Sequence, residues 1–422
     1  MYYILKKGTW MVNLLKNPSK KSIKKSSETS GKSYPKISYV IFGIALIVSL
    51  ISLVSVAFPA LISVSVVPNG FERMGLEIYK PNIFETGPLA ELLIFSNAIV
   101  FGLYIFRKKI PSVSKIFSFD IPQKISLAIV LILIVGYGSL SFSEVYTNEI
   151  YQDWNLVSDK LETWDLSEIY SFDVYVRYFL LQQSLIIFGS YKVIPLFSSM
   201  ALLAVTYLFT TSLTKNRLSG LVSVGIVLQS YTFLTFDTSS TYTTFWILFY
   251  LVSLYAVVKL WFTNPIFYVT SIFCKTLTAL FAPMSIFFIL NSNIPKKHKI
   301  ILSGTIIGLL LVGSSIMAIS DITNEEFIWH EFWVGFSAFA FQMRFDGLVI
   351  LFLVPLVFGL FVASKNNRHA NSISILIIGI LLTAPLLTGL TDKTNQPYRF
   401  LPMVVFFAVG VGILFSKVNS KV

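Results

Sequence analysis

Long apolar blocks, separated by short charged segments, recur along most of this 422-residue chain. A block of about 20 apolar residues is long enough for a helix to cross a hydrocarbon layer about 30 Å thick. Hydrophobic residues make up 55% of the chain and charged residues only 13%, whereas soluble domains carry roughly a quarter charged residues. One soluble core cannot hide this excess, because polar surface must still face water. The pattern therefore predicts an all-α, polytopic integral membrane protein.

The apolar blocks predict about ten full transmembrane helices and one short helical hairpin. The expected segments are 37–66, 89–106, 125–142, 193–213, 218–236, 242–262, 266–290, 300–319, 348–361, 373–390 and 400–415, of which 266–290 is the hairpin.

The positions of the basic residues predict which side of the membrane each segment faces. The net charge is +12, and the excess lies in the N-terminal tail and in loops, where the positive-inside rule places lysine and arginine in the cytoplasm. A nucleic-acid partner is therefore not expected. The chain divides into a basic cytoplasmic tail (1–36), two N-terminal transmembrane helices (37–110) and a larger transmembrane module (111–422). Both termini are expected in the cytoplasm.

The block 266–290 breaks a simple alternation of sides. If it crossed the membrane once, the lysines that follow it would lie outside, against the positive-inside rule. A hairpin with Lys275 near its turn returns the chain to the inside. We therefore expect two large outer loops over 144–192 and 320–346. The residues expected on the outer face are Glu149, Asp237 and His330, and those on the inner face are Lys109, Lys297 and Arg368.

Cysteine and histidine are too few to build a metal site of their own. Cys274 is the single cysteine, so neither a disulfide framework nor a CxxC motif exists. The three histidines form no HExxH motif. If a metal binds, carboxylates and water must hold it, which favours Mg²⁺, Mn²⁺ or Ca²⁺.

Acidic residues follow two of the expected spans on the outer side. Glu149 and Asp153 lie four residues apart, so they would share one face if the segment were helical. Asp237 directly follows the span 218–236. Together these carboxylates could act on one acceptor group or one metal ion. The alternatives are a solvated acidic loop and an ordinary turn aspartate.

Cations lie at the edges of apolar segments on the same expected side. Arg177 begins an apolar stretch, 176–189, that is too short to span and fits an interfacial helix. Lys275 lies within an apolar block, where a lysine usually faces a cavity or a partner. Tyr398 and Arg399 precede the last span. These side chains could bind a phosphate group, or the cations could simply anchor or snorkel at the interface.

The order of these features resembles the GT-C superfamily of polyprenyl-phosphate-dependent glycosyltransferases, including its protein O-mannosyltransferase-like branch. The resemblance extends from about residue 125 to the C-terminus. Asn148-Glu149 stands where the family has an Asp-Glu or Asp-X-Asp pair. The matching features, in chain order, are the acidic stretch 149–153, the pair Phe188-Gly189, the basic turn 214–217, Asp237, Lys275 with Pro283, and the motif 399–402.

The resemblance implies an inverting glycosyltransferase of the cell membrane. It would move a sugar from a polyprenyl-phosphate lipid to an acceptor protein or glycolipid on the outer face. Glu149 or Asp153 would be the general base, with Asp237 as a second acid. Mg²⁺ or Mn²⁺ bound by Glu149 and Asp237 could assist, and no organic cofactor is expected. The implied ligands of the donor phosphate are Arg177, Lys275, Tyr398 and Arg399.

The sequence is also compatible with two other classes of membrane protein. A transporter or lipid flippase would carry polar groups at the membrane midplane, often in repeated halves, but no convincing repeat is present and the charges gather at one face. A non-catalytic membrane subunit would explain the incomplete acidic pair.

Overall fold

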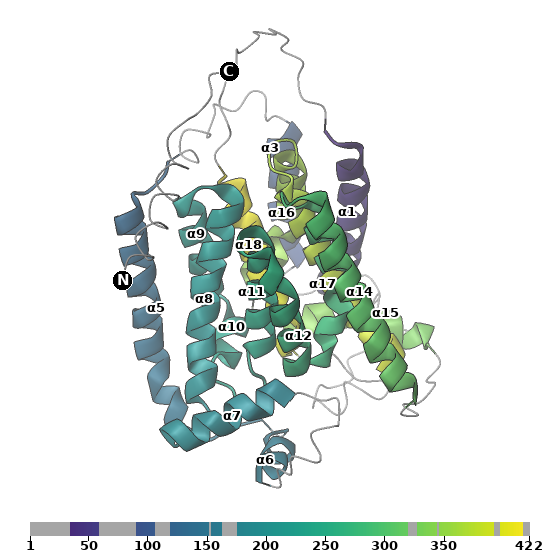
Figure 1. Ribbon diagram of the computed structural model, residues 1–422. Coiled ribbons are helices and arrows are strands. Elements are labelled where there is room, and N and C mark those ends of the chain that lie inside the picture. Colours follow the sequence, from purple (N-terminus) through teal and green to yellow (C-terminus); the bar gives the residue numbers. More distant parts are fainter. Residues whose placement is uncertain are drawn as a thin grey trace, which may run out of the picture. The chain divides into compact units, whose positions relative to one another are not determined.

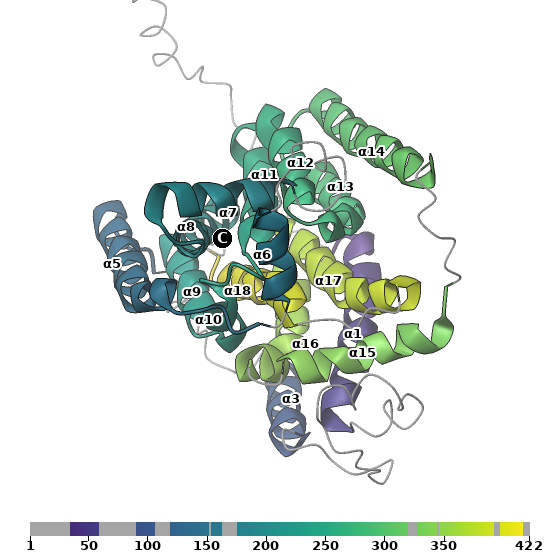
Figure 2. The ribbon, with the colours of Figure 1, turned by 90° about the horizontal axis from the view of Figure 1, so that it is seen from below.

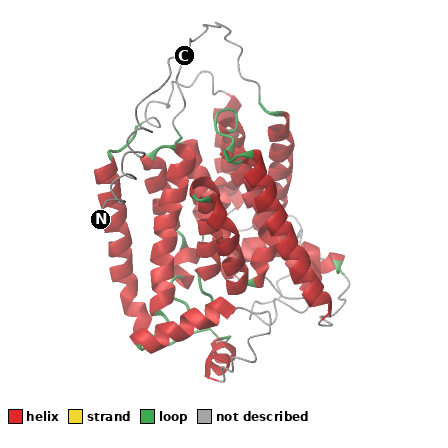
Figure 3. Cartoon of the chain, in the orientation of Figure 1, coloured by secondary structure: helices red, strands yellow, loops and turns green. Residues whose placement is uncertain are grey.

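The computed structural model describes residues 34–58, 90–105, 119–151, 153–162, 175–319, 327–343, 346–391 and 397–416. Every regular element within these ranges is a helix, as Figure 3 shows. The expected basic tail falls mainly on residues 1–33, which lie outside the described residues. Lys109 and parts of both expected outer loops, 163–174, 320–326 and 344–345, also lie outside them.

The helices lie mostly side by side in a bundle (Figure 1). In chain order, the α-helices of the first half are α1 (Lys36–Ala57), α3 (Ala90–Ile105), α5 (Gln123–Ser141), α6 (Trp154–Glu162), α7 (Tyr175–Phe188), α8 (Val193–Thr214), α9 (Arg217–Leu228) and α10 (Tyr231–Phe236). Those of the second half are α11 (Phe245–Lys259), α12 (Asn264–Cys274), α13 (Ala282–Asn291), α14 (Lys296–Ile319), α15 (Trp329–Met343), α16 (Gly347–Ala363), α17 (His369–Thr391) and α18 (Leu401–Leu414). Short 3₁₀ helices are η2 (Phe142–Tyr146), η4 (Trp261–Thr263), η5 (Thr276–Phe281) and η6 (Pro397–Phe400).

Four helical segments in the described part of the chain are long and apolar enough to cross a membrane: Lys36–Ala57, Gln123–Tyr146, Val193–Thr214 and His369–Leu390. A 22-residue helix is roughly 33 Å long, which matches the hydrocarbon thickness. Several other apolar helices, among them α11 and α16, have only 10–17 residues. Helix length and composition therefore establish four candidate spans and do not confirm the expected count of about ten.

Helix α18 forms the centre of the bundle. It is apolar on all sides and buried along almost its whole length, as expected for a helix without a polar face. It packs against α8, α9, α16 and α17, while α1 covers α15, α16 and α17. The core is therefore built mainly by segments from the second half of the chain and by α8 and α9.

The expected span 218–236 is interrupted, because α9 ends at Leu228 and α10 begins only at Tyr231. Ser230 caps α10 by accepting a hydrogen bond from the Phe233 backbone N–H, at 3.0 Å. Buried Asp346 accepts two more hydrogen bonds at this break, from the Thr232 backbone N–H at 3.2 Å and from the Thr232 hydroxyl. These acceptors satisfy N–H groups that a continuous helix would otherwise have bonded.

The segment 264–291 is also divided into two helical parts. α12 ends at Cys274, Lys275 adopts an extended conformation (φ −161°, ψ 117°), and η5 leads into α13. Pro283 lies in the first turn of α13, where its missing N–H costs nothing. The chain turns at Lys275, and α13 then packs against α14 and α17.

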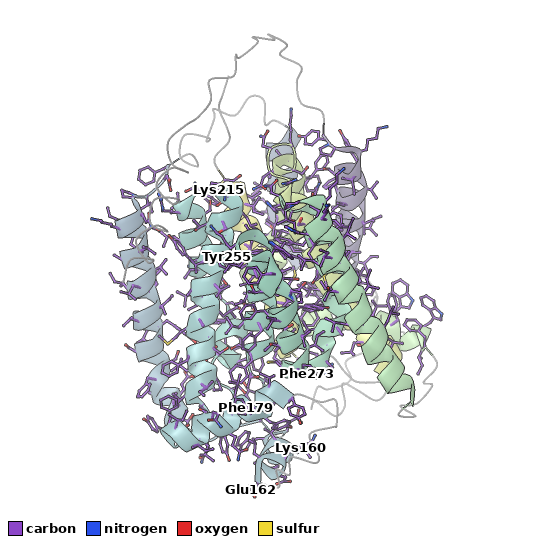
Figure 4. The ribbon with its side chains drawn as sticks, in the orientation of Figure 1. Lys160, Glu162, Phe179, Lys215, Tyr255 and Phe273 are labelled. Atoms are coloured by element: carbon purple, nitrogen blue, oxygen red, sulfur yellow. The ribbon has the colours of Figure 1, made fainter. Side chains whose placement is uncertain are left out.

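Helix α7 lies across one end of the bundle, with α6 beside it (Figures 1 and 2). It occupies nearly the whole stretch expected to be an interfacial helix, and Gly189 follows it with a φ of +71°, which favours glycine. We call this end of the bundle the α7 end and the opposite end, where α8 stops before Lys215, the Lys215 end (Figure 4).

The second expected outer loop, 320–346, contains a helix that the sequence reading did not specify. This helix, α15, packs along α17 and α1. Its Phe336 carbonyl accepts a hydrogen bond from the Ser55 hydroxyl of α1, at 3.3 Å. The segment therefore belongs to the packed bundle.

Candidate functional site

A buried polar loop, residues 237–244, connects α10 to α11 at the α7 end. Its sequence is Asp-Thr-Ser-Ser-Thr-Tyr-Thr-Thr, and all of these side chains except the half-buried Tyr242 are buried. Buried hydroxyl and amide groups need hydrogen-bond partners, because leaving them unpaired costs free energy. The hydrogen-bond partners of this loop include three of the residues selected from the sequence: Glu149, Asp153 and Arg177.

Asp237 begins the loop and points toward α5. Its Oδ2 atom accepts hydrogen bonds from the Tyr137 hydroxyl, at 2.6 Å, and the Ser141 hydroxyl, at 3.2 Å. Its Oδ1 atom is buried without a hydrogen-bond partner. Burial raises the pKa of Asp237 to about 6, the Tyr137 hydrogen bond opposes this shift, and the nearby charge of Glu144 adds to it. Asp237 is thus a carboxyl group whose ionisation is disfavoured by its surroundings.

Glu149 and Asp153 both bind the same loop, at positions beyond Asp237. Glu149 accepts hydrogen bonds from the Ser240 backbone N–H, at 2.8 Å, and from the Ser239 hydroxyl, at 3.2 Å. Asp153 accepts a hydrogen bond from the Tyr242 hydroxyl, at 2.6 Å. The loop therefore gathers the three expected carboxylates in one region.

Glu149 and Asp153 do not share a helix face, because the described residues between η2 and α6 are not helical. The backbone becomes extended at Thr147 (φ −83°, ψ 151°), and α6 starts only at Trp154. The loop 237–244, and not helical spacing, brings the two acids together. Glu144, which the sequence reading did not select, joins them by accepting a hydrogen bond from the Thr238 hydroxyl, at 3.1 Å.

The expected metal ligands, Glu149 and Asp237, bind different partners. Serines 239 and 240 donate to Glu149, whereas Tyr137 and Ser141 donate to Asp237. Among the described residues, no three or more His, Cys, Asp and Glu side chains are grouped as a metal site. These two side chains therefore do not fit a shared metal ion as they stand, and the metal site stays a prediction.

Four residues form what we call the cation cluster: Arg177, Lys275, Tyr398 and Arg399. The Lys275 ammonium group donates a hydrogen bond to the Tyr398 hydroxyl, at 2.7 Å, and lies 4.3 Å from the centre of its ring. Arg399 Nε donates to the same hydroxyl at 3.5 Å. The Arg399 Nη1 atom is buried without a partner. Two residues far apart in the sequence thus meet at Tyr398.

Arg177 joins the cluster from α7 and also holds the polar loop. Its Nη2 atom donates hydrogen bonds to the Ser240 carbonyl, at 3.2 Å, and to the Thr241 carbonyl, while its Nε atom is buried without a partner. Lys275 lies at the turn between α12 and η5, outside the four candidate membrane spans. Burial lowers the pKa of Lys275, and the like charges of Arg399 and Arg177 act in the same direction.

Tyr242 connects the carboxylates to the cation cluster. Its ring stacks on the Tyr398 ring, with centroids 4.3 Å apart and planes 15° apart, and its hydroxyl donates to Asp153. The sequence reading missed Tyr242 and Tyr137. An aromatic residue within the Ser/Thr run was a signal for Tyr242, whereas Tyr137 stands in an apolar block without any signal.

The site combines two chemical capacities. Arg177 and Arg399 each keep an unpaired, buried N–H group beside Lys275, an arrangement suited to an anion such as a phosphate. The carboxylates that the neighbouring loop gathers are suited to accept a proton from a hydroxyl group.

The fold and the site define an all-helical protein with candidate membrane spans and a site that combines carboxylates with a cation cluster. No protein-family model, curated protein or solved structure matches this chain.

Proposed function

We propose that this protein is a multi-pass membrane glycosyltransferase that transfers a sugar from a polyprenyl-phosphate donor to an acceptor hydroxyl. The observation that carries the proposal is the pair of unpaired, buried arginine N–H groups in the cation cluster, next to a loop that holds three carboxylates. A buried donor without a partner costs free energy. A bound phosphate would supply the missing acceptors.

In the proposed reaction, the acceptor oxygen attacks the anomeric carbon of the donor sugar. The new carbon–oxygen bond forms as the bond from that carbon to the phosphate oxygen breaks, so the configuration at the carbon inverts. The electron pair of the broken bond leaves with the polyprenyl phosphate. Arg177, Lys275 and Arg399 stabilise this leaving charge, because preorganised cations act strongly in a site shielded from water.

The proton of the acceptor hydroxyl passes to a carboxylate. Asp153 and Glu149 are the two candidates for this base. Asp153 is joined to the cation cluster through Tyr242, which fixes its orientation. Asp237, the first residue of the loop, is almost fully buried. It acts as a second acid that holds the loop against α5 through the hydrogen bonds from Tyr137 and Ser141.

In the proposed placement, the α7 end faces the outside of the cell membrane and both termini lie in the cytoplasm. The shorter apolar helices complete the membrane domain beside the four candidate spans. The lysines and arginines of the Lys215 end then lie inside, in agreement with the positive-inside rule. Lys275 would sit at the outer turn of the helical hairpin formed by α12 and α13.

The direct test incubates the purified full chain with labelled polyprenyl-phosphate sugars and membrane-extracted acceptors, with and without a chelator. We expect the unaltered protein to transfer sugar. One of the two variants, Glu149→Gln or Asp153→Asn, should lose nearly all turnover while it still binds the donor, and that variant identifies the base. Glu162→Gln is the matched control, because Glu162 is an exposed acid on α6. If both test variants transfer sugar as fast as the control, the assigned base is wrong. Absence of transfer with every donor would refute the proposed activity.

A further inference from the structure

Three helix junctions meet at the Lys215 end, far from the proposed catalytic site. The Asn367 side chain, before α17, donates a hydrogen bond to the Leu213 carbonyl at the end of α8, at 3.2 Å. The Asn291 side chain, at the end of α13, donates to the Arg368 carbonyl at 2.7 Å. These bonds fix the ends of α8 and α13 against the start of α17, so the junction is a built structure.

Positive side chains converge on this junction. The charges of Arg368 and Lys215 both act on the His369 imidazole, and those of Arg368 and Lys296 act on Lys299. Within the described residues, Lys215, Lys299 and Arg368 form no ion pair, and the salt bridge recorded there joins Arg217 to Asp120, at 3.4 Å. Like charges held together without counter-charges destabilise the site unless an anion binds.

A buried, unsatisfied polar atom lies in the same junction. The His369 side chain is only 8% exposed, and its Nδ1 atom has no hydrogen-bond partner. Its ring is fixed against Phe288, with centroids 5.7 Å apart. A buried polar nitrogen without a partner costs free energy. This atom is a second, independent feature that a polar ligand bound at the junction would satisfy.

Large apolar side chains are exposed directly beside the cations. Leu290 is 53% exposed, Ile300 71% and Ile301 54%. Lys299 directly precedes Ile300 in α14 and donates a hydrogen bond from its ammonium group to the Leu290 carbonyl, at 2.5 Å. A free phosphate ion has no apolar group to pack against these side chains, whereas a phospholipid has both a phosphate and acyl chains.

We infer that the junction of Lys215, Lys299, Arg368 and His369 binds the phosphate headgroup of an anionic membrane lipid, whose acyl chains cover Leu290, Ile300 and Ile301. This inference does not depend on the proposed transferase activity. The lipid serves as a structural ligand that offsets the repulsion among the cations. It also holds the α13–α14 turn against the start of α17.

The test compares lipid retention by the full chain after exchange into vesicles of phosphatidylcholine, alone or mixed with phosphatidylglycerol. Native mass spectrometry of the re-extracted protein counts tightly held lipids. The test variants are Arg368→Gln and the double variant Lys299→Gln/Arg368→Gln. The matched control is Lys124→Gln/Lys297→Gln, which removes the same charge from exposed positions at the same end of the bundle.

We expect the unaltered protein and the control to retain phosphatidylglycerol, and both test variants to lose it. Phosphatidylglycerol should also raise the thermal midpoint of the unaltered protein and of the control, but not that of the two test variants. Retention by Arg368→Gln equal to that of the control would overturn the inference, as would equal loss in the control. Inorganic phosphate that raises the midpoint as much as phosphatidylglycerol would refute the lipid as the source of the phosphate.

Discussion

Burial changes the ionisation of the Asp237 carboxyl group. Its pKa rises from 3.8 to about 6 because burial disfavours the carboxylate. The folded protein therefore binds the proton more tightly than the unfolded chain. The resulting stabilisation is present at low pH and is lost as the pH rises from about 4 through about 6.

The first prediction concerns Asp237→Asn, which cannot ionise but can still accept the Tyr137 hydrogen bond. The thermal midpoint of the unaltered protein should fall relative to that of the variant as the pH rises from about 4 to about 7. The full difference in the free energy of unfolding is on the order of 3 kcal/mol. Asp159→Asn, at an exposed position on α6, is the control. A difference between unaltered protein and Asp237→Asn that stays constant with pH would contradict this prediction.

The second prediction concerns Lys275 and Arg399, which meet at the Tyr398 hydroxyl. Replacing either by Ala should weaken binding of the polyprenyl-phosphate donor about tenfold to a hundredfold, because a hydrogen bond to a charged group contributes roughly 1.5–3 kcal/mol. Donor titration by intrinsic fluorescence measures the change. Lys160→Ala is the control, since this lysine lies over the Tyr178 ring at the same end, 5.9 Å from its centroid. Equal affinity in all three variants would exclude the cation cluster as the donor site.

At the scale of the element, the break between α9 and α10 depends on Asp346. Its Oδ2 atom accepts hydrogen bonds from the Thr232 N–H and hydroxyl groups. We predict that Asp346→Ala lowers the free energy of unfolding by about 1–3 kcal/mol, because it leaves a buried N–H group unpaired. Asp346→Asn, which keeps an acceptor oxygen, should lose less. Thermal unfolding in detergent distinguishes them, and equal loss in both variants would show that the charge of Asp346 matters more than its role as an acceptor.

The contact between α15 and α17 requires a glycine. A Cβ atom at Gly335 would lie 2.4 Å from the Pro385 Cα atom, which belongs to the backbone and cannot move aside. We predict that Gly335→Ala destabilises the protein by about 1–3 kcal/mol or more through overpacking. Gly304→Ala on α14 is the control, because no atom lies within 4 Å of its added Cβ. It should leave the thermal midpoint unchanged or raise it, since alanine favours helix. A higher midpoint for Gly335→Ala would mean that the two helices can separate.

At the scale of the whole molecule, the proposed placement in the membrane assigns the α7 end and the Lys215 end to opposite sides. With buried Cys274 replaced by Ala, a cysteine at exposed position 160 should react with an impermeant reagent in intact cells. A cysteine at exposed position 297 should react only after the cells are opened. Labelling of position 297 from outside would invert or refute the proposed topology. The assay does not depend on any enzymatic activity.

Local sequence patterns predicted several elements closely. The segments 125–142, 193–213 and 373–390 lie almost entirely within α5, α8 and α17, because a long apolar stretch has few ways other than a helix to satisfy its backbone in lipid. The helix at 176–189 was predicted from the same kind of pattern. Lys275 was singled out because a lysine costs free energy inside an apolar block.

The sequence by itself determined the all-helical class, the membrane character and the list of candidate site residues, because these depend on composition and on local spacing. Only the tertiary structure decided how those residues combine. Lys275 meets Tyr398 across 123 residues of chain, and Tyr242 meets Asp153 across 89. No local pattern encodes such contacts, since they follow from which helices pack together and where each helix ends. The break at Ser230 and the helix at 329–343 were missed for the same reason, because Asp346 and α17, distant in sequence, stabilise them.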